Sequence, residues 1–187
     1  LFDPETGVIL GAQIVGTEGV DKRIDDLANA VRFKLTGTQL QEMELAYAPP
    51  FSSAKDPVNM AGYVVENMME GLMKPFYVED LENLPADAQK VDVRTEAEYA
   101  KGTIPGFINI PLDSLRERLG ELDLTKKVYI TCQIGLRGYL AQRILEQHGA
   151  DTENLAGGYR LYEMAEKDKK AMAAVAGKCA ACGMEIS

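Results

Sequence analysis

The sequence contains few of the residues that most often activate a nucleophile or build a disulfide framework. It has a single histidine, His148, so we do not expect a paired cysteine and histidine in a catalytic site. Its three cysteines are an odd number, which argues against a disulfide framework and favours a reducing cytoplasm. It also lacks an apolar run long enough to span a bilayer and the pattern of a secretory signal.

Positive charge is also scarce. Lys and Arg number 20 against 29 Asp and Glu, which gives a net charge of −9. Nucleic acids and anionic membranes attract clustered basic residues, so neither is an expected partner. The composition is 46% hydrophobic and 26% charged, which is typical of one or two small globular domains.

One cysteine lies between a predicted strand and a predicted helix. Residues 127–131 form a short β-branched and aromatic run, Cys132 follows, and apolar residues recur at helical spacing from Leu136 until Gly149. The first N–H groups of a helix have no intrahelical partner, and the helix dipole adds to their positive field. Arg137 adds a permanent positive charge, so we expect this loop to favour a thiolate, a persulfide or an oxyanion.

The length of this loop separates two chemistries. An average intracellular cysteine is a small buried apolar residue, but the glycines of C-Q-I-G-L-R-G let the backbone curl around the sulfur. The cysteine phosphatase signature is one residue longer between its Cys and Arg, so a phosphatase or arsenate reductase is the less favoured alternative. The shorter loop suits a sulfur atom carried as a persulfide. The predicted site comprises Cys132 and Arg137 as catalytic residues and a substrate-binding loop of Gln133, Ile134, Gly135, Leu136 and Gly138.

Residues 75–166 are predicted to form an α/β domain. Strands are expected at residues 76–78, 90–93, 107–110, 128–131 and 153–155, and helices near residue 97 and at 112–119, 136–148 and 158–165. This alternation favours a mainly parallel sheet covered by helices on both faces. Asp92 and Arg94 follow the second strand, where we expect a salt bridge or turn pair that supports the fold, with direct catalysis as the alternative.

Four segments in this region resemble motifs of rhodanese (sulfurtransferase) domains, in the order typical of that family. The resemblance covers Tyr77 to about Glu166 and implies that Cys132 accepts a sulfur from thiosulfate, polysulfide or a low-molecular-weight persulfide. Arg137 is then expected to attract the donor, and an acceptor thiol to remove the sulfur. The segments are V-D-V-R-T-E-A-E-Y-A at 91–100, G-T-I-P-G-F-I-N-I-P at 102–111, C-Q-I-G-L-R-G at 132–138 and N-L-A-G-G-Y at 154–159.

Residues 1–74 are predicted to form a hairpin with helices. The hairpin has a first strand of only two residues and a second strand at 8–15, so we expect the chain to be the C-terminal part of a longer protein. Helices are predicted at 20–35, at 38–45 and from Asp56-Pro57 to about 72.

These first residues resemble the end of the dimerisation domain of flavoprotein pyridine-nucleotide disulfide reductases, in the branch of coenzyme A disulfide reductases and NADH oxidases. The resemblance implies upstream FAD and NAD(P)H domains, a homodimer, and a place for Tyr47 at the substrate end of the parent active site. The residues alone leave Tyr47 equally compatible with a core aromatic. The matching segments are G-A-Q-I-V-G at 11–16, D-K-R-I-D at 21–25 and E-L-A-Y-A-P-P-F-S-S-A-K-D-P-V-N-M-A-G at 44–62.

The remaining residues, 167–187, form a predicted tail that is disordered or redox-active. Cys179 and Cys182 form a C-x-x-C, but two further ligands for a structural zinc are not evident, so we expect no metal site. The ending also resembles the start of small sulfur-carrier domains, with Ile186 in place of their second cysteine. We therefore hypothesise a rhodanese-type module of a CoA-disulfide or persulfide reductase. A non-catalytic interaction or regulatory module is the alternative.

Overall fold

The computed structural model describes residues 1–181, with the side chains described as far as residue 173. The chain divides into two compact units, Leu1–Met73 and Lys74–Ser187, and each is described by itself. Among the described residues, no helix combines the length and the apolar character needed to cross a membrane.

The first unit is built from three helices, α1 (Val20–Arg32), α2 (Gly37–Glu42) and α3 (Pro57–Met69). Helices α2 and α3 approach each other closely, because a Cβ added at Gly62 would lie 2.5 Å from the backbone nitrogen of Gln41. The helices enclose a small core that also includes a residue of the N-terminal segment. Its buried members are Ile9, Leu27, Ala30, Leu40, Val58 and Val65.

The start of α3 agrees with the sequence prediction. The Asp56 side chain caps the helix by accepting a 3.0 Å hydrogen bond from the N–H of Val58. Asn59 Oδ1 in turn accepts a hydrogen bond from the N–H of Asp56. Arg23 forms an ion pair with the same carboxylate at 3.0 Å. The charge-assisted bond holds the pKa of Asp56 below its ordinary value, although burial opposes the shift more than any single bond favours it.

The predicted hairpin of the first unit is present, but its second strand is shorter than predicted. Phe2 and Ile9 form an antiparallel bridge, the N–H of Asp3 donates to the carbonyl of Val8 at 2.9 Å, and the N–H of Leu10 donates to the carbonyl of Leu1 at 2.9 Å. Val8 also forms an antiparallel bridge with Thr36, the residue that precedes α2. Residues 12–15, which were predicted to continue the second strand, belong to no strand.

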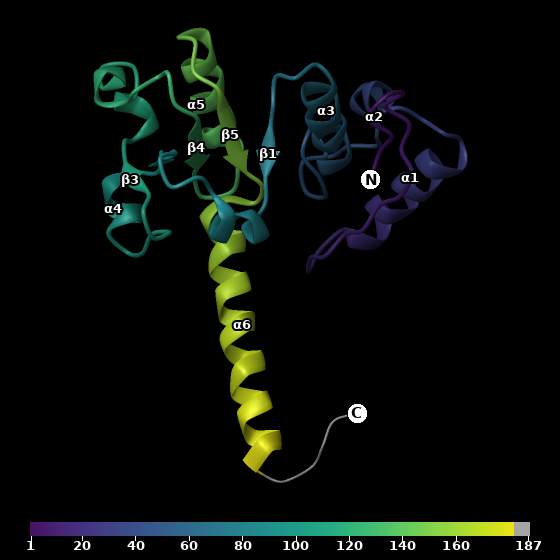
Figure 1. Ribbon diagram of the computed structural model, residues 1–187. Helices are drawn as coiled ribbons and strands as arrows, with labels where there is room; N and C mark the ends of the chain where they lie inside the picture. Colours follow the sequence, from purple (N-terminus) through teal and green to yellow (C-terminus); the bar gives the residue numbers. More distant parts are fainter. Residues whose placement is uncertain (182–187) are drawn as a thin grey trace. The chain divides into compact units, whose positions relative to one another are not determined.

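The second unit contains the expected parallel sheet, visible in Figure 1. All four pairings are parallel, and the strand order is β1-β5-β4-β2-β3. Parallel strands place their carboxyl ends at one edge of the sheet, so the loops after β2 and β4 lie at the same edge. The strands are β1 (Pro75–Phe76), β2 (Gln89–Asp92), β3 (Ile108–Asn109), β4 (Val128–Thr131) and β5 (Thr152–Leu155).

Helices cover both faces of this sheet. Successive strand residues point to opposite faces, so Ile130 of β4 packs in one core and Tyr129 in the other. On the Ile130 side lie α5 (Leu136–Gln147) and the 3-10 turns η2 (Leu112–Ser114) and η3 (Leu119–Glu121), which replace the single helix predicted at 112–119. The Tyr129 side is covered by η1 (Val78–Asn83) and by the first turns of α6 (Gly158–Ala181).

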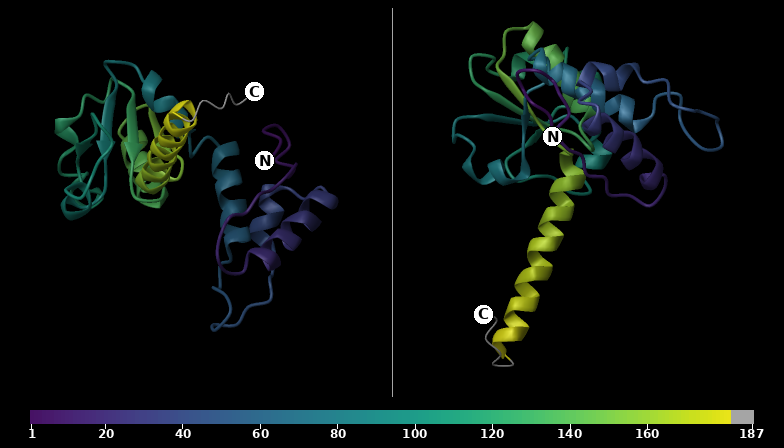
Figure 2. Two further views of the ribbon diagram at one scale, coloured as in Figure 1. Left: turned by 90° about the horizontal axis from the view of Figure 1, so that it is seen from below. Right: turned by 90° about the vertical axis from the view of Figure 1, so that its right-hand side faces the viewer.

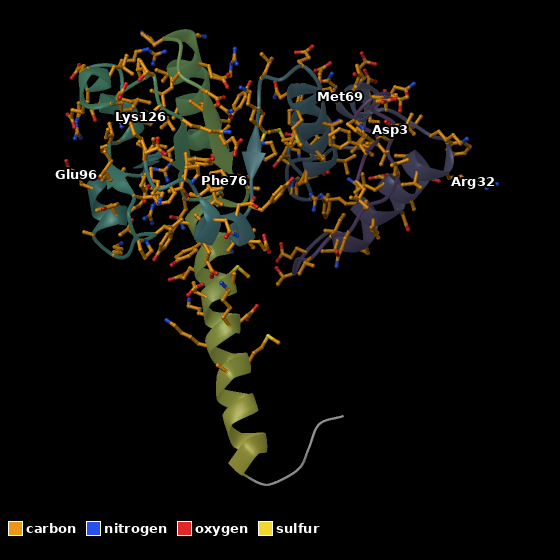
Figure 3. The ribbon with its side chains drawn as sticks, in the orientation of Figure 1. Asp3, Arg32, Met69, Phe76, Glu96 and Lys126 are labelled. Atoms are coloured by element: carbon orange, nitrogen blue, oxygen red, sulfur yellow. The ribbon has the colours of Figure 1, made fainter. Side chains whose placement is uncertain are left out.

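Aromatic packing joins the edge strand to the centre of the sheet. Phe76 of β1, labelled in Figure 3, meets the ring of Tyr129 edge-on, with the ring centroids 5.1 Å apart and an interplanar angle of 81°. This edge-to-face arrangement is the one that the ring quadrupoles favour. The contact therefore fixes β1 within the core that α6 covers.

Helix α6 corrects the prediction for the end of the chain. The helix was expected to stop near residue 165, but it continues through Ala181 and extends well beyond the sheet (Figure 2). The segment is rich in Glu, Lys, Ala and Met, which have high helix propensity, and Lys167 pairs with Glu163 one turn earlier at 3.3 Å. The prediction of a disordered tail is therefore wrong for residues 167–181. Cys182 and the side chain of Cys179 lie outside the described residues.

Candidate functional site

Cys132 is the first residue after β4, at the edge of the sheet where the strands end. Cys132 is 1% exposed, and its Sγ accepts a hydrogen bond from the N–H of Gly135 at 3.1 Å. Gly135 has a φ of 123°, a conformation that side chains rarely adopt, and it immediately precedes α5. The expected strand, loop and helix are therefore present, and the loop turns its own backbone toward the sulfur.

Other parts of the second unit hold this loop in place. The carbonyl of Cys132 accepts from the N–H of Tyr159 at 2.7 Å, and the carbonyl of Gln133 accepts from the N–H of Arg160 at 3.1 Å. From β5, Asn154 Nδ2 donates to the carbonyl of Gly135 at 3.0 Å. The loop is thus anchored at its first, second and fourth residues.

The glycine after Arg137 has a packing role. A Cβ added at Gly138 would lie 2.0 Å from Asn154 Oδ1, so a side chain there would displace the amide that holds Gly135. The N–H groups of Leu136, Arg137 and Gly138 belong to the first turn of α5, where a helix supplies no acceptor for them. Of the loop amides that the sequence predicted around the sulfur, Gly135 is the one that donates to it. The side chains of Ile134 and Leu136 face solvent instead, at 62% and 61% exposed.

Arg137 is paired with an acidic residue that the sequence interpretation did not single out. Its two terminal nitrogens donate to the two carboxylate oxygens of Glu98, each at 2.7 Å. These bonds from Arg137, followed by those from Thr95, lower the pKa of Glu98 to about 2 against the opposing effect of burial. In turn, the bond to Glu98 raises the pKa of Arg137. Arg137 is therefore already paired, and the expectation that it attracts a donor stays a prediction.

The missed residue had a local signal of a different kind. Glu98 stands three residues after Thr95, the spacing of a capping box, and it closes that box at the start of α4 (Glu96–Tyr99). The motif explains the residue as a helix cap and gives no hint of a partner 39 positions away. Only the parallel pairing of β2 with β4 brings the segment after β2 beside the cysteine loop.

Asp92 and Arg94 form a buried ion pair beneath the site. Arg94 Nη2 and Asp92 Oδ2 lie 2.6 Å apart, and both residues are at most 1% exposed. Arg94 also donates to the carbonyl of Gly102 at 2.7 Å and lies over the Tyr159 ring, with the guanidinium carbon 3.9 Å from the centroid. Every contact of the pair is internal, which supports the interpretation that it holds the strand-end loops together.

The other predicted residues lie elsewhere. Tyr47 belongs to the first unit and is 51% exposed, so it is not a core aromatic of that unit. It borders an open hollow together with Glu44, Lys55 and Tyr63. His148, at the end of α5, has its Nδ1 2.8 Å from the carbonyl of Ile144. The part of the chain that the structure describes contains no group of three or more His, Cys, Asp or Glu side chains that could hold a metal ion.

Comparison with protein families finds a match in each unit. A rhodanese-like domain matches residues 77–165, and the dimerisation domain of pyridine nucleotide-disulphide oxidoreductases matches residues 1–58. The two matches follow each other along the chain, with the dimerisation-domain match in the first unit and the rhodanese-like match in the second.

Two solved structures match the chain across both units, and one curated relative matches a shorter segment. The crystal structure of reduced CoADR-RHD of Bacillus anthracis is 46% identical, with a TM-score of 0.83, over 86% of this chain and 29% of that one. An NAD-dependent persulfide reductase of A. fulgidus is 38% identical, with a TM-score of 0.69, over 79% of this chain and 26% of that one. A coenzyme A disulfide reductase of Staphylococcus aureus (strain bovine RF122 / ET3-1) is 53% identical over 62 residues, which are 33% of this chain and 14% of the relative. The chain therefore spans only a minor part of each.

Proposed function

We propose that the second unit is a sulfurtransferase that carries sulfane sulfur as a persulfide on Cys132. The single observation that supports this most directly is the N–H of Gly135 donating to Cys132 Sγ, in a loop that leads straight into the first turn of α5. A backbone N–H that donates to the sulfur beside a helix start favours the anionic forms of the sulfur without a general base. The match of residues 77–165 to a rhodanese-like domain supports the same chemistry.

The transfer has two balanced steps. The Cys132 thiolate attacks the outer sulfur of the donor, a new S–S bond forms, and the bond to the donor breaks with its electron pair leaving on sulfite or a thiolate. An acceptor thiolate then attacks the outer sulfur of the persulfide and releases the Cys132 thiolate. In this proposal Gln133, Ile134, Gly135, Leu136 and Gly138 form the loop, and Asp92 and Arg94 support it.

We place this module in a longer reductase. The match of residues 1–58 to a dimerisation domain supports a homodimer with FAD and NAD(P)H domains elsewhere in the parent protein. Relatives described as a coenzyme A disulfide reductase and a persulfide reductase support CoA disulfide or a persulfide as the substrate of that parent. Tyr47 would then stand at the substrate end of the reductase site, and its exposure is consistent with that role.

A non-catalytic interaction or regulatory module is the second candidate, and one observation favours it. Cys132 is 1% exposed and its neighbour Arg137 is engaged by Glu98, so a donor must displace surrounding groups to reach the sulfur. The two candidates differ in whether Cys132 ever acquires a sulfur atom.

Mass spectrometry separates the candidates. The protein is treated with thiosulfate or polysulfide, digested, and examined for the mass of one added sulfur on the Cys132 peptide. Cyanide should then remove it as thiocyanate, and Cys132→Ser should gain none while keeping its circular dichroism spectrum. Failure of wild type to acquire sulfur from any donor would favour the interaction module.

A further inference from the structure

We propose that Glu98 is a specificity-determining residue at the mouth of the Cys132 loop, the part of the site bordered by Arg137 and Glu98, and that it disfavours donors whose sulfane-sulfur group carries two negative charges. The proposal rests on the sulfurtransferase function and names the class of donor it accepts: one whose sulfane-sulfur group carries at most one negative charge. Thiosulfate, a dianion, is then a poor donor, and monoanionic or uncharged donors are better ones.

The argument starts from the geometry of the ion pair. Arg137 and Glu98 meet through two parallel hydrogen bonds of 2.7 Å, the bidentate arrangement in which guanidinium and carboxylate fit best. A donor anion that binds Arg137 must therefore compete with a carboxylate already held in the favoured geometry. This competition lowers the affinity for Arg137 most for a ligand that binds through its charge alone.

Glu98 cannot easily swing away, because its carboxylate has further bonds of its own. Its Oε2 atom accepts from both the N–H and the hydroxyl of Thr95, each at 2.9 Å, in addition to Arg137. These bonds tie the carboxylate to the first turn of α4. The acid is thus a fixed part of the mouth rather than a mobile surface charge.

The charges around the sulfur decide the sign of the effect. The bond to Glu98 is the largest cause that raises the pKa of Arg137, burial opposes it, and the negative charges of Glu98, Cys132 and Asp92 add to the rise. Asp92 forms a buried ion pair with Arg94, and Arg137 forms an ion pair with Glu98. These two pairs are each neutral, so the Cys132 thiolate gives these five groups one net negative charge. A dianion is repelled more strongly than a monoanion.

The Glu98 and Arg137 side chains are both 32% exposed, which sets the expected size of the effect. Water and salt screen a pair in that position, so the discrimination is moderate. Two donors allow a clean comparison, because thiosulfate and methanethiosulfonate both transfer a terminal sulfur from a sulfonyl sulfur and differ by one negative charge. The S–S bond that breaks leaves its electrons on sulfite in the first case and on methanesulfinate in the second.

The experiment measures kcat/KM for both donors in wild type and Glu98→Gln. Glutamine can keep the reciprocal bond to Thr95 while removing the charge. We expect kcat/KM for thiosulfate to rise roughly three- to tenfold more than that for methanethiosulfonate. Glu98→Asp, which keeps the charge, should restore the wild-type preference.

Thr95→Ala is the matched control, because it removes the cap of α4 and leaves both charges. Thr95→Ala should change kcat/KM for the two donors by the same factor. Equal effects of Glu98→Gln on both donors would show that Glu98 only positions Arg137, and would overturn the proposal while leaving the sulfurtransferase function intact. Absence of transfer from wild type with either donor would instead overturn the function itself.

A measurement on wild type alone keeps the proposal testable if Glu98→Gln does not fold. An unpaired arginine attracts thiosulfate, so its kcat/KM would fall steeply as ionic strength rises. A mouth neutralised by Glu98 predicts a flat or rising dependence. A steep fall in wild type would contradict the assignment of Glu98.

Discussion

The backbone N–H of Tyr159 donates a 2.7 Å hydrogen bond to the carbonyl oxygen of Cys132. The start of α6 is thereby fastened to the residue that carries the proposed chemistry. Gly158 precedes this contact with a φ of 60°, and a Cβ added to it would lie 2.4 Å from the same carbonyl oxygen. The loop and the helix start therefore fit together only when residue 158 has no side chain.

Replacing this glycine should disturb the loop directly. We expect Gly158→Ala to lower the free energy of unfolding by roughly 2 kcal/mol or more, because backbone atoms must shift and alanine is strained at a positive φ. Sulfur transfer should fall further than stability alone accounts for, since the carbonyl of Cys132 moves. Urea unfolding and a thiocyanate assay measure the two effects.

Gly120→Ala is the matched control for that substitution. Gly120 lies in η3, and a Cβ added there meets nothing within 4 Å. Its effect on the free energy of unfolding should stay within about 0.5 kcal/mol. An effect of Gly158→Ala as small as that of the control would show that the contact with Cys132 is easily relaxed.

The buried ion pair should be strongly sensitive to loss of one partner. We expect Arg94→Met to destabilise the protein by roughly 3–5 kcal/mol, because it leaves the Asp92 carboxylate buried without its cation. Glu121→Gln tests an exposed pair, since Glu121 meets Arg118 on the surface at 2.6 Å, and should cost less than about 1 kcal/mol. Chemical denaturation measures the free energy of unfolding of both variants and of wild type. Similar losses in the two variants would contradict the structural role of the buried pair.

The bond between Glu98 and Arg137 should make stability depend on acid pH. The pKa of Glu98 is lowered from 4.5 to about 2, so the stabilisation is present above pH 4.5 and is lost as pH falls toward 2. Wild type and Arg137→Gln should therefore differ in free energy of unfolding by a constant amount near neutral pH. That difference should shrink through the acid range. A difference that stays constant down to pH 2 would contradict the ion pair.

The first unit should mediate self-association through apolar side chains that it leaves at its surface. Met60 and Val64 lie one turn apart on α3 and are 45% and 40% exposed. In the homodimer that we propose, Val64→Glu should weaken dimerisation at least about tenfold by burying a charge in the interface. Ile108→Glu, at an exposed apolar position in the second unit, should leave it unchanged. Sedimentation equilibrium distinguishes a monomer from a dimer in each variant.

The sequence was most informative where local and tertiary signals agree. Lys127 to Gly149 carries a β-branched run, a glycine at the turn and a helical repeat, and the structure has β4, the Cys132 loop and α5 in that order. The alternation of such units was enough to predict a parallel sheet covered on both faces. The order of its strands was not predicted, because no local pattern states which strand lies beside which.

The remaining errors have particular physical causes. The Glu98 partnership depends on two segments that only strand pairing brings together, and the capping box offered a complete local explanation of the same residue. The second strand of the predicted hairpin is shorter than expected, because the bridges to Phe2 and Thr36 involve only Ile9 and Val8. The length of α6 was underestimated although its Ala, Lys and Glu content favoured a helix, since the tail was interpreted by its cysteines instead.

The parallel sheet has a consequence for the order in which the protein is made. Edge strand β1 pairs with β5, and the carbonyls of Cys132 and Gln133 are satisfied by Tyr159 and Arg160. During synthesis, β5 leaves the ribosome after β1, and Tyr159 and Arg160 leave it after the Cys132 loop. A nascent chain therefore presents its cysteine before the residues that enclose it exist. Until α6 begins to form, the thiol is open to any oxidant or electrophile in its surroundings.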